Sequence, residues 1–352
     1  MITKILHMVL KIEDKILWKV KPEKNRIEFF TNESTELEGN FKEITQELEN
    51  RGYTPNFYGV KFKGSIKDKI RYFFVCLNQL YRCKKAEVVI LNDNNYVIST
   101  IKPDHLKVCQ IWHASGAVKK FGSQLKQRKY KISGYDRVFC CGKYWKDIFS
   151  KAFNIERDNV VITGLPDTDT IYMEREKEPE QVISYLPTFR GNSMDGIRWV
   201  DLDTEKIKKD LPEGWVFQTR YHPLIPKESD TTDSTLDCIK KSKIVITDYS
   251  SVLFDASLLK DKVILLYVPD LEGYKKEIGY NINIEEDFRG YIAKTEDELY
   301  KLIIQAIEGK INENSSKIRN KYMEGVDGQS VKAIADEIER LLCKENEYRK
   351  IK

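Results

Sequence analysis

The amino-acid sequence predicts an α/β protein made of two doubly wound halves, each a parallel sheet covered by helices. Short apolar runs alternate along the chain with segments of helical periodicity, which is the pattern of β-α-β units. A length of 352 residues fits about two domains of ordinary size. Because 41% of the residues are hydrophobic and 32% are charged, the chain can bury a core and is not a disordered tract.

The expected strands fall into two sets. The first set comprises 87–91, 107–112, 137–141 and 160–163, and the second comprises 182–186, 215–219, 244–247 and 263–267. Residues 166–181 lie between the sets, contain two prolines and show no apolar period, so we predict an interdomain linker there. The domains would then be 1–165 and 182–328, followed by a C-terminal helix over 329–352 that packs back on the first domain.

Two expected helices combine apolar and basic residues. One is formed by the N-terminal twenty residues, and the other covers 66–81, with Ser65 as a candidate N-cap. One face of the second helix carries Ile66, Ile70, Phe73, Phe74, Leu77 and Tyr81, and Lys67, Lys69 and Arg71 lie off it. Each helix either packs on the first sheet or lies on a membrane surface. No apolar run reaches the roughly 18 residues that cross a bilayer, and the charged N-terminus does not resemble a signal peptide.

Composition narrows the classes of site and partner. The net charge is +4, but 21 basic and 7 acidic residues between positions 61 and 157 give that segment a charge of +14. Such a segment either attracts an anionic partner, such as nucleic acid, phospholipid headgroups or a phosphorylated substrate, or is a solvated lysine-rich surface. Seven cysteines without a CxxC pair fit small core residues in a reducing compartment, and argue against a disulfide scaffold or a cysteine-type zinc site.

Ligands of open parallel sheets bind beyond the carboxyl ends of the strands, so the residues that follow each strand are candidates. His113 comes directly after the strand at 107–112, and small residues and two lysines follow over 114–120. Small residues let a ligand approach the backbone, and the N-terminus of a helix there would favour an anion. A histidine suits a general base at neutral pH, although His113 could also be a loop histidine that only forms hydrogen bonds.

A second histidine follows a strand of the other half. Arg220 and His222 lie just past the strand at 215–219, and Pro223 restricts the turn after them. The chain has only four histidines, and two of them follow strand ends, one in each half. Two facing sheets would bring His113 and His222 into one cleft, unless both positions arise by chance.

Hydroxyl groups and an arginine follow two more strands of the second half. Ser250 and Ser251 open a helix after the strand at 244–247, where they either bind phosphate together with backbone N–H groups or simply cap the helix. Thr188 and Arg190 follow the strand at 182–186, and Arg190 could clamp a phosphate bidentately, although any surface arginine would look the same. Neither a nucleotide-binding glycine motif nor a plausible set of metal ligands is present, so arginine, lysine, hydroxyl groups and helix ends would have to meet phosphate charge.

Together these segments resemble the CDP-glycerol glycerophosphotransferase family of teichoic acid synthesis. The matching pieces, in the family's order, are WHASGAVKKFG at 112–122, GYDRVFCCGKYW at 134–145, GLPDTD at 164–169, YLPTFR at 185–190, RYHP at 220–223 and TDYSSVLFD at 247–255. The resemblance covers about residues 85–330. It implies a GT-B type fold, with two Rossmann-like domains whose parallel sheets face a central cleft that holds the active site.

The resemblance also implies roles for individual residues. His113 and His222 correspond to the family's catalytic histidines, and Ser250 and Ser251 to the serine pair that holds the CDP pyrophosphate. Further donor-phosphate contacts are expected from Arg190, Thr188, Asp255 and Arg220, and acceptor-side contacts from Ser115, Gly116, Lys119 and Lys120.

Two departures from the family pattern are informative. The polymerases tend to have WHGTPLKKLG where this chain has WHASGAVKKFG, which is similar to the single-addition primases. Those primases also lack the polymerases' additional N-terminal region, and a length of 352 residues fits that. Asp167 stands where the family usually has arginine after GxP, so a phosphate contact is in doubt at that position.

The resemblance implies transfer of glycerol phosphate from CDP-glycerol to a hydroxyl of a polyprenyl-diphosphate-linked disaccharide, with release of CMP and no cofactor. His113 would accept the proton of the attacking hydroxyl, and His222 would stabilise or protonate the leaving CMP phosphate. Because the acceptor is a lipid, we expect a peripheral protein on the anionic cytoplasmic face of the cell membrane.

Four alternatives remain open. A relative could use a ribitol donor or polymerise glycerol phosphate, and an ordinary GT-B nucleotide-sugar glycosyltransferase could share the fold without needing paired histidines. An RNA-binding protein could use the basic segment, but the sequence lacks an RNP pattern, a GXXG loop in a KH context and clustered arginines, so we expect no nucleic-acid partner. A catalytically inactive membrane scaffold would have no need for both histidines.

Overall fold

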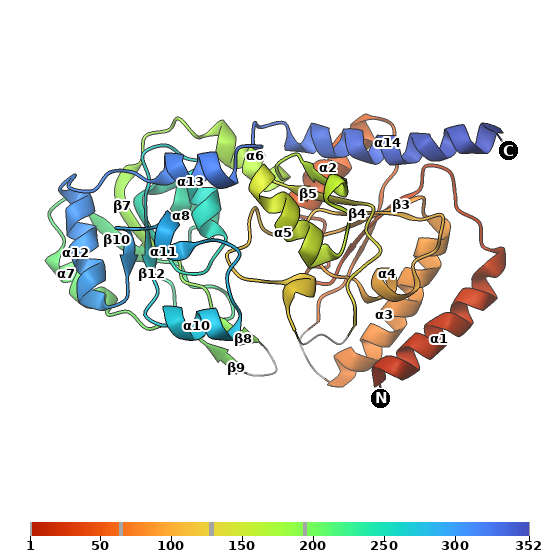
Figure 1. Cartoon of the computed structure of the whole chain (residues 1–352), viewed down its shortest axis with the longest axis horizontal. Coiled ribbons are helices and arrows are strands. Elements are labelled where there is room, and N and C mark those ends of the chain that lie inside the picture. The colour runs from red at the N-terminus through yellow and green to blue at the C-terminus, as the bar shows by residue number, and fades with distance from the viewer. Residues whose placement is uncertain (1, 63–65, 127–129, 193–195, 352) are drawn as a thin grey trace. The chain divides into compact units, whose positions relative to one another are not determined.

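A computed structural model describes residues 2–62, 66–126, 130–192 and 196–351 (Figure 1). The chain divides into two compact units. The first unit comprises Met1–His113, Phe121–Asp169 and Gly325–Lys352, and the second comprises Ala114–Lys120 and Thr170–Glu324.

The first unit is built on a six-stranded parallel sheet with strand order β2-β1-β3-β4-β5-β6. The strands are β1 (Ile27–Thr31), β2 (Asn56–Gly59), β3 (Val88–Leu91), β4 (Lys107–Gln110), β5 (Arg137–Cys140) and β6 (Val160–Ile162). The four strands expected between 87 and 163 are confirmed, whereas β1 and β2 were not expected. The strand β3 is buried along its whole length, as a strand covered on both faces should be.

Helices cover this sheet. They are α1 (Ile2–Ile16), α2 (Gly39–Asn50), α3 (Ile66–Lys85), α4 (Tyr96–Ile101), α5 (Lys143–Phe153) and α14 (Ser330–Ile351), with 3-10 turns at Leu17–Lys19, Gly122–Gln124 and Arg157–Asn159. The C-terminal helix α14 packs on α2, where Arg51 contacts Asp336 and Glu339 at 2.7 Å each. Ser65, the candidate cap of α3, lies outside the described residues.

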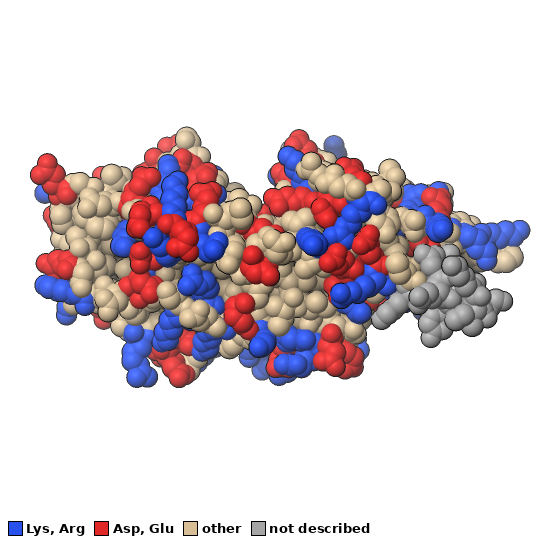
Figure 2. All heavy atoms as spheres, turned by 90° about the horizontal axis from the view of Figure 1, so that it is seen from above, with Lys and Arg blue, Asp and Glu red and all other residues tan. Residues whose placement is uncertain are grey.

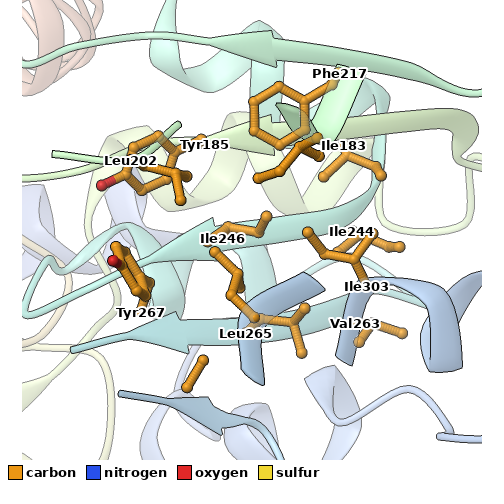
Figure 3. Packing of buried hydrophobic residues seen from close by; sticks show 13 residues of the cluster. Ile183, Tyr185, Leu202, Phe217, Ile244, Ile246, Val263, Leu265, Tyr267 and Ile303 are labelled. Carbon is orange, nitrogen blue, oxygen red and sulfur yellow. The ribbon is translucent and has the colours of Figure 1, made fainter. Parts of the chain in front are cut away.

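The second unit is built on a five-stranded parallel sheet with strand order β10-β7-β11-β12-β13. The strands are β7 (Glu180–Tyr185), β10 (Val216–Thr219), β11 (Ser242–Thr247), β12 (Val263–Tyr267) and β13 (Ile292–Ala293), and β8 (Arg190–Asn192) pairs with β9 (Gly196–Arg198) as a separate antiparallel hairpin. All four strands expected in this half are confirmed. Ile244 and Ile246 pack with Leu265 in the core of Figure 3.

Seven helices of the second unit are described: α7 (Thr204–Asp210), α8 (Thr235–Lys241), α9 (Val252–Ser257), α10 (Leu271–Glu277), α11 (Ile284–Asp287), α12 (Glu296–Ile307) and α13 (Ser315–Tyr322). Local sequence explains where some of them begin. Thr295 and Glu298 form a capping box at the start of α12, and Ser234 and Asp237 form another at the start of α8. The α/β class with two parallel sheets is therefore confirmed.

Three expectations about the connections are wrong. Residues 114–120 pack with the second unit and not within the first domain. No helix begins directly after β4, where residues 111–121 form an irregular segment. The expected linker is largely regular, since residues 166–173 form α6 (Pro166–Met173), and the division between the units falls inside that helix. Proline suits the first position of a helix, and Asp167 and Asp169 favour its first turn.

The apolar face predicted for residues 66–81 lies largely on the outside of α3. Ile70 and Phe74 are each 62% exposed, whereas the residues of α3 that reach the core are Val75, Cys76, Leu80 and Cys83. The helix therefore packs on the sheet with one apolar face and leaves a second apolar face uncovered. Among the described residues, none of the helices has the length and hydropathy needed to cross a membrane.

Charge on the surface is mixed where it can be seen. On the face shown in Figure 2, Lys and Arg side chains are interspersed with Asp and Glu side chains. The positive excess of residues 61–157 therefore forms no continuous basic area on that face.

Candidate active-site residues

His113 lies at the carboxyl edge of the first unit's sheet, directly after the connection from β4. Its Nδ1 atom is 3.2 Å from the backbone oxygen of Asn92, which follows β3, and 4.0 Å from Oε1 of Glu33, which follows β1. Since β1, β3 and β4 are neighbours in the sheet, three strand ends together surround this imidazole.

The hydrogen bond to Asn92 fixes the tautomer of His113. A carbonyl oxygen only accepts hydrogen bonds, so in the neutral ring Nδ1 carries the proton and donates it. The lone pair then remains on Nε2, and the side chain is 44% exposed. His113 therefore has the protonation pattern of a general base that is open to a substrate.

The residue before His113 has an unusual backbone. Trp112 adopts a φ of 61°, in the left-handed region that a bulky side chain rarely occupies. Its N–H donates to Oε1 of Gln110 at 2.9 Å, and its ring stacks on Phe121 at 4.9 Å. The ring of His113 lies 4.1 Å from that of Trp112, so a buried and well-packed residue holds the imidazole in place.

A cavity of about 170 Å³ lies beside His113 within the first unit. Its lining includes four carboxylates, from Glu33, Glu36, Glu38 and Asp167. Burial raises the pKa of Asp167 and is also the main cause of the raised pKa of Glu33. This carboxylate lining suits hydroxyl groups better than phosphate.

His222 lies past the end of β10 in the second unit and has the opposite tautomer. Its Nδ1 atom accepts a hydrogen bond from the N–H of Leu224 at 3.2 Å, so in the neutral ring the proton is on Nε2. The ring lies 4.8 Å from that of Phe189. Burial lowers the pKa of His222, and the nearby charge of Lys119 lowers it further. A neutral His222 therefore presents an Nε2–H donor.

Arg190 is bound by carboxylates, contrary to the expected phosphate clamp. It is 5% exposed, and its guanidinium contacts Asp248 at 2.7 Å and Asp270 at 2.8 Å. Nη1 also donates to the backbone oxygen of Thr188, and the group lies over the ring of Tyr249 at 4.7 Å. With these donors engaged, Arg190 cannot present a bidentate fork to phosphate in this arrangement.

Arg190 instead organises the loop after β7. Burial opposes its charge, but Asp248 and Asp270 together raise the pKa of Arg190. The backbone N–H of Thr188 donates to both carboxylate oxygens of Asp248, at 3.1 and 3.2 Å. Asp248 thereby joins the arginine to the backbone of residues 188–190, and Thr188 is itself buried.

Ser250 and Ser251 lie at the start of α9, as expected. Oγ of Ser250 accepts a hydrogen bond from the N–H of Val252 at 3.3 Å. Ser251 is the N-cap residue, and its side chain makes no capping hydrogen bond to the described residues. Capping therefore does not use the Ser251 hydroxyl.

The segment 114–120, named here the strap, joins the second unit through several hydrogen bonds. Oγ of Ser115 donates to Oδ1 of Asp255 at 2.5 Å, and the N–H of Lys120 donates to the backbone oxygen of Gly279 at 3.1 Å. Asn281 holds the strap from both its backbone and its side chain, donating to the backbone oxygens of Val118 and Lys119 at 2.8 Å each.

The four residues expected on the acceptor side therefore lie in the same unit as the donor-side candidates. Ser115 and Gly116 are buried, Lys120 is exposed, and Lys119 lies close to His222. Arg220 follows β10 directly, and its N–H donates to the backbone oxygen of Tyr185 at 3.0 Å. Across the part of the chain that the structure describes, His, Cys, Asp and Glu side chains form no group of three that could hold a metal ion.

Sequence analysis missed the partners of these residues. Glu33 and Asn92 beside His113, and Asp248 and Asp270 around Arg190, were not selected. Asp248 directly follows the predicted strand at 244–247, so its position was visible, but its pairing with an arginine 58 residues away was not. Lys119 was expected among first-domain residues, but residues 114–120 belong to the second unit.

Known proteins share both the sequence and the fold. The teichoic acid glycerol-phosphate primase of Bacillus subtilis is 29% identical over 279 residues, covering 69% of this chain and 72% of the primase. The teichoic acid ribitol-phosphate primase of Bacillus spizizenii is 26% identical over 386 aligned positions, covering 97% of this chain and 98% of that primase. The solved structure of the wall teichoic acid polymerase TagF superposes with a TM-score of 0.69 at 18% identity, covering 98% of each chain, and so has the same fold.

A family model provides the most direct assignment. The model for CDP-glycerol:poly(glycerophosphate) glycerophosphotransferases matches residues 14–340, which is nearly the whole chain. The chain belongs to this family, whose relatives include the primases and polymerases that add glycerol phosphate or ribitol phosphate in teichoic acid synthesis.

Proposed function

We propose that this protein is a teichoic acid primase that transfers glycerol phosphate from CDP-glycerol to a hydroxyl of a polyprenyl-diphosphate-linked disaccharide. The observation that carries the proposal is the opposite partners of the two Nδ1 atoms, a backbone oxygen for His113 and a backbone N–H for His222. In the neutral rings these partners leave a lone pair on Nε2 of His113 and a proton on Nε2 of His222. One ring is prepared to accept a proton and the other to donate a hydrogen bond, which are the two needs of this reaction.

His113 acts on the acceptor in this proposal. The acceptor oxygen attacks the phosphorus of the glycerol phosphate group, and its proton passes to Nε2 of His113. The bond between that phosphorus and the oxygen shared with CMP breaks, and CMP leaves with the electron pair. The positive charge that develops on His113 is favourable next to Glu33, whose Oε1 is 4.0 Å from Nδ1.

His222 acts on the donor. Its Nε2–H donates to an oxygen of the leaving CMP phosphate, where negative charge increases during the reaction. Ser250 and Ser251 would hold the diphosphate with their hydroxyl groups and the backbone at the start of α9. A TagF variant has been studied in crystals soaked with CDPG, which supports a CDP-alditol as the class of donor for this family.

Mass spectrometry of the product tests the proposal. We expect the purified protein, given CDP-glycerol and a soluble analogue of the lipid-linked disaccharide, to add one glycerol phosphate unit and release an equal amount of CMP. A ladder of products would instead identify a polymerase. No transfer from either CDP-glycerol or CDP-ribitol would contradict the proposed reaction class.

A ribitol-phosphate primase is the second candidate. The observation that favours it is the share of each primase that aligns with this chain. That share is 98% for the ribitol-phosphate primase and 72% for the glycerol-phosphate primase. Turnover with CDP-ribitol and none with CDP-glycerol in the same assay would select this alternative.

We further propose that the protein binds the membrane surface through α1 and α3. These helices pack on each other, and Lys84 of α3 forms an ion pair with Asp14 of α1 (Figure 1). Large apolar side chains are exposed along both helices and the turn after α1: Ile5, Met8, Ile12, Ile16, Trp18, Ile70, Phe74 and Tyr81. We call these residues the α1–α3 surface. Exposed lysines on α1, such as Lys4, Lys11 and Lys15, add attraction of about 1 kcal/mol each for anionic headgroups.

Replacing Ile12 and Phe74 together with aspartate is expected to weaken vesicle binding at least tenfold, since each apolar side chain contributes about 1.5–3 kcal/mol when buried. Co-sedimentation with vesicles containing phosphatidylglycerol, at low and high salt, measures the effect. Met173→Asp is the matched control, because Met173 is 77% exposed but lies on α6. Equal vesicle binding by the double variant and the control would show that the α1–α3 surface does not bind the membrane.

A further inference from the structure

The second unit contains a half-buried cation without a counter-charge of its own. Lys119 is carried by the strap, and its Nζ atom lies 5.5 Å from the centre of the Phe189 ring. Across the described residues, this ammonium group forms no ion pair with a carboxylate and donates no hydrogen bond, and its contact is with the aromatic ring. A charge removed from water without a partner is costly, and burial accordingly lowers the pKa of Lys119.

The surrounding charges do not neutralise Lys119. Asp248 attracts it, but that carboxylate is already bound at 2.7 Å by Arg190, whose positive charge opposes Lys119. The charge of Lys119 also acts on His222, lowering the pKa of that imidazole. Lys119, His222 and the ring of Phe189 between them therefore form a cluster with excess positive potential and an N–H donor. An anion is the ligand that such a cluster lacks.

The strap is built to hold Lys119 in this position. Three residues of the second unit form hydrogen bonds with the strap on both sides of the lysine. Asp255 bonds Ser115, Asn281 bonds Val118 and Lys119, and Gly279 bonds Lys120. Backbone atoms on both sides of Lys119 are thus fixed. A flexible surface lysine needs no such support, whereas a lysine that must meet a small ligand does.

We propose that Lys119 binds the diphosphate of the CDP-alditol donor together with His222, and that Ser115 and Asp255 position it by anchoring the strap. This inference rests on the proposed function, and it moves Lys119 from the acceptor side to the donor side. The donor's diphosphate would provide the negative charge that Lys119 lacks within the protein. Asp255 then supports the donor site through the strap and not by touching phosphate.

Isothermal titration calorimetry tests the role of Lys119. Binding of CDP is compared with binding of cytidine, which lacks the phosphates. We expect Lys119→Met to weaken CDP binding about 10- to 100-fold, as for the loss of a charged hydrogen bond, and to leave cytidine binding unchanged. Lys119→Arg should restore most of the CDP affinity. Lys276→Met is the matched control, because Lys276 is an exposed lysine of the same unit, on α10.

The outcomes separate this inference from the proposed function. If the wild-type protein binds no CDP, the proposed donor class is wrong. If the wild-type protein binds CDP and Lys119→Met binds it equally well, only the role of Lys119 is wrong. Equal losses of CDP and cytidine affinity would indicate a disturbed fold, and would also overturn the inference.

The positioning role of Ser115 has its own test. Ser115→Ala is expected to weaken CDP binding severalfold in the wild-type background and to have no further effect in Lys119→Met, because its contribution acts through the lysine. Additive losses of CDP affinity in the double variant would contradict the proposal that Ser115 acts by positioning Lys119. The His222 imidazole, followed by NMR titration, should have a higher pKa in Lys119→Met than in the wild type, which reports their proximity without any ligand.

Discussion

Replacing His113 with alanine is expected to lower kcat about 10²–10⁴-fold, which is the usual contribution of a general base. In the proposed reaction the acceptor hydroxyl loses its proton as it attacks phosphorus, and Nε2 carries the lone pair of the neutral, partly exposed His113 ring. Because the side chain is 44% exposed and, among the described residues, bonds a backbone oxygen, its loss should change the free energy of unfolding little.

CMP release with a soluble acceptor analogue measures this effect. Binding of CDP should be unchanged, since His113 acts on the acceptor in our proposal. The control is His7→Ala, because His7 lies on α1 and has no role in the proposed reaction. A kcat for His113→Ala within a fewfold of the wild-type value would rule out this histidine as the base.

Glu33 extends the argument about His113. Its carboxylate is 4.0 Å from Nδ1, and the positive charge of a protonated His113 would lower the pKa of Glu33, which burial otherwise raises. The two groups therefore stabilise each other's charged forms once the proton has moved to His113. Because this attraction grows as the proton moves to His113, it stabilises the transition state more than the ground state.

The sheets were largely predictable from sequence because most of their strands are apolar on both faces. The strand β3 reads VVIL and β12 reads VILLY, and each is buried throughout. The strand β1 escaped prediction because it contains Glu28, which is fully buried and paired with Arg26 at 2.6 Å and Arg82 at 3.0 Å. A buried ion pair satisfies the charge, but only the folded structure brings Arg82 to this strand. Missing β1 also meant missing Glu33, which follows it.

The apolar face of α3 shows a second reason why sequence-based prediction is incomplete. Periodicity identified the helix and grouped Ile70, Phe74 and Tyr81 correctly on one side. The core, however, takes the other apolar side, with Cys76 and Leu80 fully buried. A helix with two apolar faces does not say by itself which one meets the sheet. That depends on the neighbouring helices, and α1 covers only part of the surface.

Candidate catalytic residues were predictable only as positions at strand ends. His113 and His222 were found this way, and the tautomers that distinguish their roles come from Asn92 and Leu224, which contribute backbone atoms. Any amino acid could supply these backbone atoms, so the sequence does not reveal such partners. The strap was misassigned for a similar reason, because the hydrogen bonds that attach it to Gly279 and Asn281 span more than 150 residues.

Arg190→Met is expected to destabilise the folded protein by about 3–5 kcal/mol, because it leaves the carboxylate of Asp248 buried without its ion-pair partner. Asp248 is 2% exposed, and its remaining contacts include the backbone N–H of Thr188. Urea denaturation measures the loss. The matched control is Arg198→Met in the same hairpin, where an exposed pair with Glu277 at 3.4 Å should contribute only about 0–1 kcal/mol.

The pH dependence identifies the cause of that loss. In the wild type, burial raises the pKa of Asp248 and Arg190 is the first of the groups that lower it. Without Arg190, the pKa of Asp248 in the folded state rises further above its unfolded value, so the folded state binds a proton more tightly and gains stability as the pH falls. The deficit of Arg190→Met should therefore shrink as the pH falls. Adding Asp248→Asn should recover part of the stability and weaken this trend, since the most buried carboxylate beside position 190 would be gone and only the partly exposed Asp270 would remain there. A deficit that is constant with pH would mean that Arg190 stabilises the fold through its packing on Tyr249 and Tyr274, and not through charge.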